Sequence, residues 1–158
     1  MDTKEYERLV MKYLDCIYRV ALNGCKNSMD AEDIVQSTFM KLLVCNEIFE
    51  KDESVKYWLI RVAINESNSL WRSSWKKRTV SLEQMQQEPI FSTPEKSNLY
   101  YAMKELPVKY RQILHLYYFE DYSVREIADI MKLSETAVQT RLFRARQKLK
   151  KILKESNL

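Results

Sequence analysis

Apolar side chains recur every three to four residues over most of the chain, which is the spacing of amphipathic helices. Residues 4–22 carry such a stripe, and Asn23–Gly24 then favours a helix stop. A second helix is expected from about residue 30, and a third from about Val55 into Trp71–Trp75. The apolar stripes consist of Val10, Leu14, Ile17 and Ala21 in the first helix, Ala31, Ile34, Val35, Phe39 and Leu42 in the second, and Trp58, Leu59, Val62, Ala63 and Leu70 in the third.

Residues 80–97 interrupt this periodicity. The stretch is rich in Gln and Ser, and Pro89 and Pro94 exclude a long helix within it. We interpret it as a flexible linker between two small helical domains, and an irregular loop inside one domain is the alternative. The single Gly and three Pro also leave few residues for tight hairpins. The sequence therefore predicts an all-α protein with a first domain at residues 1–79 and a second at 98–158.

The second domain has the pattern of a helix-turn-helix. Ser123 and Glu126 have the spacing of a capping box that opens a short helix. Lys132–Leu133 then makes a short turn, and Ser134 caps a long basic helix that runs to about Lys154. This order of short helix, turn and long helix is typical of proteins that place a helix in the major groove of DNA.

Charge is distributed unevenly along the chain. Residues 1–53 carry a net charge of −4 and residues 81–106 a net charge of −2. Residues 54–80 and 107–158 each carry +5, so the overall charge of +4 hides two basic blocks. Two such blocks indicate two contacts with a polyanion, although solvated helix faces would have the same composition.

The outward face of the last helix is suited to duplex DNA. A major groove admits one helix, whose polar side chains read base edges, while basic residues contact the phosphates. The alternative is a solvent-exposed helix, which is often rich in Lys and Arg. The candidate DNA-contacting residues are Thr136, Gln139, Thr140, Arg141, Phe143 and Arg144.

A second polar stripe follows the third predicted helix, opposite its apolar side. It combines an aromatic ring, guanidinium groups and amides, the mixture that binds the bases and phosphates of single-stranded nucleic acid. Trp71 and Trp75 lie beside it and either stack on bases or pack against the first helix. The stripe consists of Tyr57, Arg61, Asn65, Asn68 and Arg72.

No enzyme site is indicated by the sequence. Cys16, Cys25 and Cys45 lack metal-ligand spacing and are expected to be reduced packing residues in a cytoplasmic protein. The single histidine, His115, has apolar neighbours and is expected to pack rather than to act as a base. The sequence has no nucleophile constellation, phosphate-binding Gly loop or apolar run near ~20 residues. We therefore expect no catalytic residue, no metal or other cofactor, and no membrane insertion.

Five segments resemble, in order, the successive motifs of extracytoplasmic-function sigma factors. Together they cover almost the whole chain, with the linker where that family has one. The segments are Asp30-Ala-Glu-Asp-Ile-Val-Gln-Ser-Thr-Phe39, Trp58-Leu-Ile-Arg-Val-Ala-Ile-Asn65, Leu106-Pro-Val-Lys-Tyr-Arg111, Glu126-Ile-Ala128 and Arg141-Leu-Phe-Arg-Ala-Arg146.

The resemblance implies a factor that binds core RNA polymerase and directs it to promoter DNA. The second helix would dock on the β′ clamp, with Asp33, Gln36 and Met40 on that surface. The third helix and the loop after it would melt and read the minus-ten element, with Asn65 meeting an extruded base. The linker would thread toward the active site and RNA exit channel, and the last domain would sit on the β flap and read the minus-thirty-five element. The family also implies an anti-sigma factor as a partner.

Three positions depart from the family pattern. Ser69 stands where Asp is frequent, and Thr136-Ala137 stands where Gly-Thr is common. Lys132 replaces the usual Gly of the turn, where a left-handed Lys would add ~1–2 kcal/mol of strain. Two other functions stay open: a helix-turn-helix regulator that works without polymerase, and a sigma-like decoy that binds an anti-sigma factor.

Overall fold

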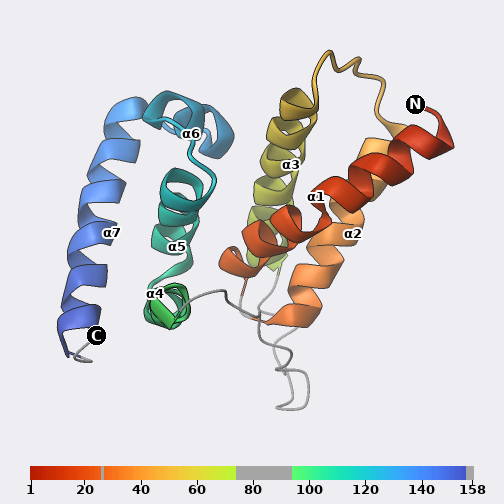
Figure 1. Ribbon diagram of the computed structural model, residues 1–158. Helices are drawn as coiled ribbons and strands as arrows, with labels where there is room; N and C mark the ends of the chain where they lie inside the picture. The colour runs from red at the N-terminus through yellow and green to blue at the C-terminus, as the bar shows by residue number, and fades with distance from the viewer. Residues whose placement is uncertain (26, 74–93, 156–158) are drawn as a thin grey trace. The chain divides into compact units, whose positions relative to one another are not determined.

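The computed structural model describes residues 1–25, 27–73 and 94–155, and within these ranges every regular element is a helix (Figure 1). The expected all-α fold is confirmed. The chain forms two compact units, Met1–Gln86 and Gln87–Leu158, each of which is described by itself. The helices are α1 (Thr3–Asn23), α2 (Ser28–Val44) and α3 (Asp52–Ser73) in the first unit, and α4 (Pro94–Lys104), α5 (Val108–Leu114), the π-helix η3 (His115–Phe119), α6 (Val124–Met131) and α7 (Glu135–Glu155) in the second.

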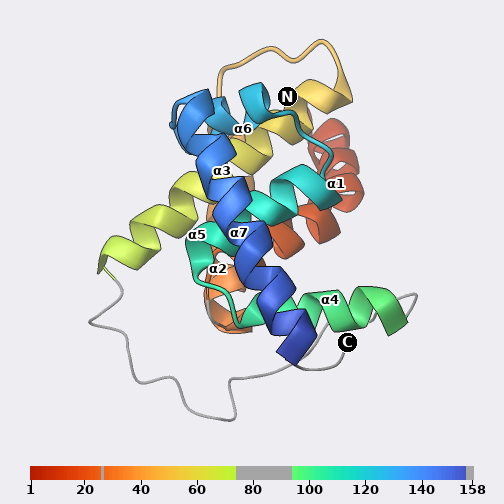
Figure 2. The same cartoon turned by 90° about the vertical axis from the view of Figure 1, so that its left-hand side faces the viewer.

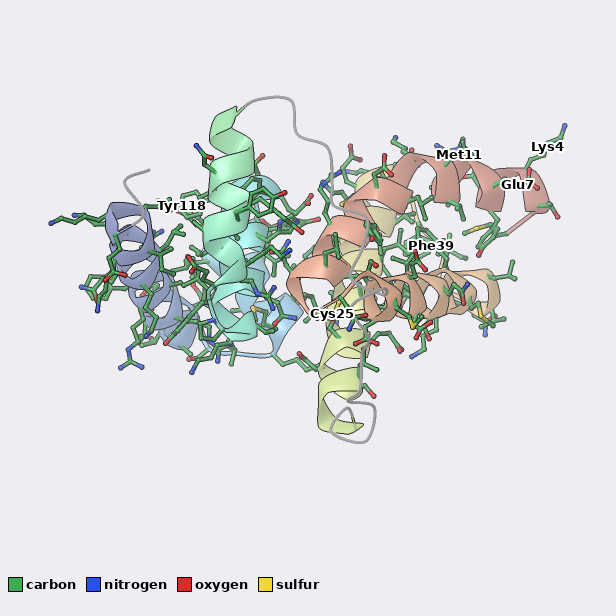
Figure 3. The ribbon with its side chains drawn as sticks, turned by 90° about the horizontal axis from the view of Figure 1, so that it is seen from below. Lys4, Glu7, Met11, Cys25, Phe39 and Tyr118 are labelled. Carbon is green, nitrogen blue, oxygen red and sulfur yellow. The ribbon has the colours of Figure 1, made fainter. Side chains whose placement is uncertain are left out.

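In the first unit, α1, α2 and α3 pack against one another in pairs (Figure 1). Phe39 points from α2 into the space between α1 and α2 (Figure 3) and is buried there. The Tyr6 hydroxyl donates a hydrogen bond of 2.9 Å to the Phe39 carbonyl, which ties the start of α1 to α2. The largest fully buried side chains of this unit are Leu9, Ile17, Leu42, Leu59, Ile60 and Ile64.

The apolar stripes of α1 and α3 are turned relative to the sequence prediction. Leu14, expected in the core, is exposed. Trp58 and Val62 are only half-buried, whereas Ile60 and Ile64 are fully buried. The reason is that α3 packs against both α1 and α2, so its buried face is wider than a single amphipathic stripe.

The start of α3 is fastened to α1 by charged side chains. Asp52 accepts hydrogen bonds from Arg8 Nη1 at 2.8 Å and from Lys12 Nζ at 2.7 Å. The Tyr13 hydroxyl donates to the Asp52 carbonyl at 3.1 Å. Hydrogen bonds from Arg8 and then Lys12 hold the pKa of the Asp52 carboxyl well below its usual range. Arg8 and Lys12 lie 44 and 40 positions before Asp52 in the sequence, so these bonds fix how α1 and α3 align with each other.

The first helix of the second unit, α4, begins at Pro94, so the last four residues of the predicted linker are helical. Proline is favoured at a first helical position because its missing N–H group would have had no intrahelical partner. The rest of the predicted linker lies outside the described residues. In Figure 2, α7 runs across α4 and α5, with which it packs. The core of this unit includes Ile113, Leu116, Ile127, Ile130, Val138 and Leu142.

The predicted helix-turn-helix is confirmed in detail. Ser123 Oγ accepts from the Glu126 N–H at 3.1 Å, and Glu126 Oε1 accepts from the Ser123 N–H at 2.9 Å. These two bonds form the capping box of α6. Lys132 then takes the left-handed conformation, with φ 58° and ψ 46°, so the turn keeps its shape without Gly. Ser134 Oγ caps α7 by accepting from the Ala137 N–H at 3.0 Å.

Candidate functional site

The outward side of α2 carries the three predicted docking residues. Asp33, Gln36 and Met40 are all exposed, because the opposite side of the helix is occupied by core residues. An apolar extension that sequence reasoning missed continues this surface beyond Met40. It consists of Leu43 and Val44 at the end of α2 and Ile48 in the following loop. Ile48 is 93% exposed. In the sequence these residues look like a continuation of the buried stripe.

The predicted polar stripe of α3 is only partly on the surface. Asn65 and Ser69 are exposed, whereas Tyr57, Arg61 and Asn68 are half-buried. The stripe borders the buried side of α3 and therefore lies partly against the bundle. The side chains of Trp71 and Arg72, and all of Trp75, lie outside the described residues.

An ion pair joins α2 to α3 beside both of these surfaces. Lys41 Nζ pairs with Glu66 Oε1, and each residue directly follows a candidate site residue, Met40 on α2 and Asn65 on α3. The Glu66 side chain is 19% exposed, so the pair lies at the edge of the α2–α3 contact. Sequence reasoning did not find this pair, because its partners are 25 positions apart.

The outward face of α7 presents the residues predicted to contact duplex DNA. Arg141 is half-buried on the flank, whereas the rest of the predicted set is exposed. Phe143 is 57% exposed, which is unusual for a phenyl ring outside a contact surface. The opposite face packs inward through Val138, Leu142 and Ala145. The exposed members of the set are Thr136, Gln139, Thr140, Phe143 and Arg144.

Arg146 belongs to the same basic run but is held by aromatic side chains. Its Nε donates to the Tyr118 hydroxyl at 2.5 Å. Its guanidinium lies 5.4 Å from the Tyr117 ring centroid and 5.6 Å from that of Tyr118. Arg146 is therefore less available to a phosphate than Arg144, although the sequence places both in one run.

His115 is buried, as predicted for a packing residue, and its ring stacks on Phe119 at 5.4 Å. It also has a polar partner that sequence reasoning missed. His115 Nε2 lies 2.9 Å from Glu120 Oε2, and the two side chains are only 5% and 4% exposed. Residues five apart do not meet on an α-helix, so the spacing gave no sign of this pair.

Residues 1–25, 27–73 and 94–155 contain no group of three or more His, Cys, Asp or Glu side chains placed to hold a metal ion. Within the same ranges, none of the helices has the length and apolar character needed to cross a membrane.

Two family descriptions match the two units. Residues 9–77 match sigma-70 region 2, and residues 96–149 match sigma-70 region 4. The extracytoplasmic-function RNA polymerase sigma factor SigM of Bacillus subtilis is 35% identical over 152 residues, which cover 91% of this chain and 92% of SigM. The sigma factor SigV of the same organism is 33% identical over 134 residues, covering 81% and 78%.

Solved structures show the same fold. The sigma factor RpoE, determined in complex with the anti-sigma factor NepR from Bartonella quintana, superimposes with a TM-score of 0.78 at 24% identity, covering 96% of this chain and 98% of RpoE. CnrH, in complex with the cytosolic domain of CnrY, gives a TM-score of 0.67 at 22% identity, covering 98% and 90%.

A helical region-2 bundle followed by a region-4 helix-turn-helix defines a transcription initiation factor of the sigma-70 class. Within that class, the chain belongs to the extracytoplasmic-function sigma factors. Such a factor binds core RNA polymerase and directs promoter-specific initiation of transcription.

Proposed function

We propose that this sigma factor divides promoter recognition between its two units. The first unit docks on the β′ clamp and holds the melted minus-ten element, and the second sits on the β flap and reads the minus-thirty-five duplex. The observation that carries the proposal is the presence of two chemically different surfaces, an amide-bearing stripe on α3 and an outward-facing basic helix, α7. The linker between the units threads toward the polymerase active site.

Docking through α2 is supported by its exposed side. Asp33 and Gln36 can pair with basic and polar groups of a partner, while Met40 adds an adaptable apolar contact. Met40 is 65% exposed and, together with the exposed Leu43 and Val44 of the same helix, forms an apolar patch of the kind that marks a protein contact. These three residues are therefore the proposed contact with the clamp.

Minus-ten recognition is assigned to α3. Asn65 has both a donor and an acceptor, so it can pair with the edge of a base once that base is extruded. Tyr57 and Arg61 lie on the same side of the helix and are half-buried, which limits their freedom and favours a preformed surface. Asn68, Ser69 and Arg72 complete the proposed contact.

Minus-thirty-five recognition is assigned to α7. In the proposed docking, the N-terminal turns of α7 lie at the base edges and the later turns near the phosphates, as in other helix-turn-helix proteins. Thr136, Thr140 and Phe143 offer methyl and aromatic groups for thymine methyls, whereas Gln139, Arg141 and Arg144 offer hydrogen bonds to bases or phosphates.

We further propose that an anti-sigma factor holds the chain inactive in the cytoplasm. RpoE was solved in complex with the anti-sigma factor NepR, and CnrH in complex with the cytosolic domain of CnrY. In this scheme the chain is a binding protein and the polymerase supplies the catalysis. A regulator without polymerase, or a decoy, is less well supported because both sigma regions are present in one chain.

Run-off transcription tests the proposal. Core RNA polymerase, the full chain and a linear template carrying the promoter of the chain's own operon should yield a discrete transcript that neither protein yields alone. Replacing the minus-ten sequence of the template should abolish it. A factor that binds the duplex but gives no transcript with core enzyme would favour the regulator, and one that binds neither would favour the decoy.

A further inference from the structure

A π-helix, which is wider than an α-helix and uncommon in proteins, directly follows α5. Residues His115–Phe119 form a π-helix, and the Glu120 N–H donates to the His115 carbonyl at 3.1 Å. The Tyr122 N–H reaches back to the Leu116 carbonyl at 3.1 Å. Between these donors, Asp121 takes the left-handed conformation with φ 59°. This short segment fixes the direction in which the helix-turn-helix departs.

The buried side chains of His115 and Glu120 join the two ends of this segment. Five residues along an α-helix correspond to a rotation of about 140°, at 3.6 residues per turn, so these side chains would point apart. A π-helix closes its hydrogen bonds between residues five apart and brings such residues into register. The contact of 2.9 Å between His115 and Glu120 therefore fits the π form, whereas an α-helical path would turn the two side chains apart.

The same segment contacts the DNA-reading helix. Arg146 of α7 bonds to the Tyr118 hydroxyl and lies over the Tyr117 ring. Figure 3 shows Tyr118 beside α7. Arg146 lies midway along α7, so its contact with the tyrosines bears on how this helix is held against the rest of the unit. If the segment reverted to an α-helix, the tyrosines would rotate relative to α5 and lose this contact.

We propose that the His115–Glu120 contact locks η3 in the π form and thereby positions α6 and α7 for duplex DNA. The inference rests on the proposed role of α7. A buried polar pair contributes little net stability, but it excludes competing arrangements that would leave its groups unpaired. His115 and Glu120 are thus positioning residues, which act on DNA binding through the register of the helix-turn-helix.

The test replaces both partners with apolar side chains of similar size, His115→Leu with Glu120→Leu, in the full chain. Removing both polar groups together avoids leaving one member of the pair buried without the other, so the melting temperature should fall less than in His115→Leu or Glu120→Leu alone. Without the lock, the amides of Glu120 and Tyr122 should exchange hydrogen about tenfold faster. Affinity for a duplex carrying the minus-thirty-five element should fall by about tenfold.

Two further variants separate positioning from general packing. His115→Gln keeps a side-chain donor toward Glu120 and should restore most of the affinity and amide protection. Gln112→Leu makes the same kind of change in α5, at a side chain that is 4% exposed and whose Nε2 has no hydrogen-bond partner among the described residues. It should leave duplex affinity unchanged.

Wild-type amide exchange together with wild-type duplex affinity in the double variant would overturn the proposal. An equal loss of affinity in Gln112→Leu would also overturn it, because the effect would then be one of packing. If the wild-type chain does not bind the duplex at all, the role proposed for α7 is wrong. Amide exchange would still decide whether the lock exists.

Discussion

At the scale of single residues, the turn between α6 and α7 contains a residue in a strained backbone conformation. The family pattern has Gly at this position, and Lys132 occupies it with φ 58°. The Leu133 N–H still donates to the Ala128 carbonyl at 2.9 Å, so the turn is kept and the strain is accepted. The sign of this strain in the sequence was the departure from the family pattern, which has Gly where Lys132 stands.

Replacing Lys132 with Gly should therefore stabilise the second unit. The gain should be about 1 kcal/mol, since relief of left-handed strain is partly offset by the greater freedom of Gly in the unfolded chain. Urea unfolding followed by circular dichroism would measure it. Lys132→Ala keeps the strain and serves as the control, and an equal gain in that variant would show that strain is not the cause.

Asp52 offers a residue-level test in the first unit. Its pKa is lowered by Arg8 and then by Lys12, so its contribution to stability is present above its ordinary pKa of 3.8 and is lost as the pH falls from there toward its folded value. Asp52→Asn should lower the melting temperature at pH 7 and have progressively less effect in acid. All three tryptophans lie in residues 1–86, so tryptophan fluorescence reports on this unit. A difference that persists unchanged to pH 2 would contradict the account.

At the scale of helices, the sequence predicts well where helices form, but it predicts less well which side of each helix is buried. The buried stripe of α2 and the outward face of α7 were placed correctly, because each of these helices shows one clear buried side and one clear outward side. The side of α3 that faces the core was misplaced, because that helix is covered by two neighbours and has no single apolar stripe. The π-helix left no periodic signal, since it depends on a contact between His115 and Glu120.

The exposed side of α2 makes a direct prediction about docking. Asp33→Ala combined with Gln36→Ala should weaken binding to core polymerase by about tenfold or more, because polar partners on the polymerase would be left unpaired. Affinity is measured by titration of labelled chain with core enzyme, and circular dichroism checks the fold. Asp15→Ala, at another exposed acidic residue of this unit, is the matched control. Unchanged affinity in the double variant would remove α2 from the interface.

The exposed side of α7 predicts a change in salt dependence. Each phosphate contact contributes about 0.9 to the slope of log affinity against log salt concentration. Arg141→Ala with Arg144→Ala should make the slope for a duplex promoter fragment less steep, with a magnitude smaller by about two. Arg146→Ala should change it less, because Tyr118 and Tyr117 already hold that side chain. Equal slopes for the wild type and the double variant would show that these arginines do not touch the backbone of DNA.

At the scale of the whole molecule, the uneven charge matches the division of tasks. Residues 1–53 carry a net charge of −4 and include α2, where a protein partner is proposed and where three acidic residues and one lysine leave a net charge of −2. The two blocks of +5 include the residues proposed to contact DNA. A decoy would need only surfaces for protein partners, and a duplex regulator would need only α7. The exposed Asn65 on α3 is the feature that neither of these explains.

Promoter opening by the holoenzyme therefore tests the central claim most directly. With wild-type chain, permanganate should modify unpaired thymines around the minus-ten element of a linear promoter. Asn65→Ala should retain polymerase binding and minus-thirty-five duplex binding but lose this reactivity, because extrusion of a base costs a few kcal/mol that the missing contact no longer offsets. A pre-opened bubble should restore activity only in part. A normal permanganate pattern with Asn65→Ala would contradict the assignment of strand opening to this face of α3.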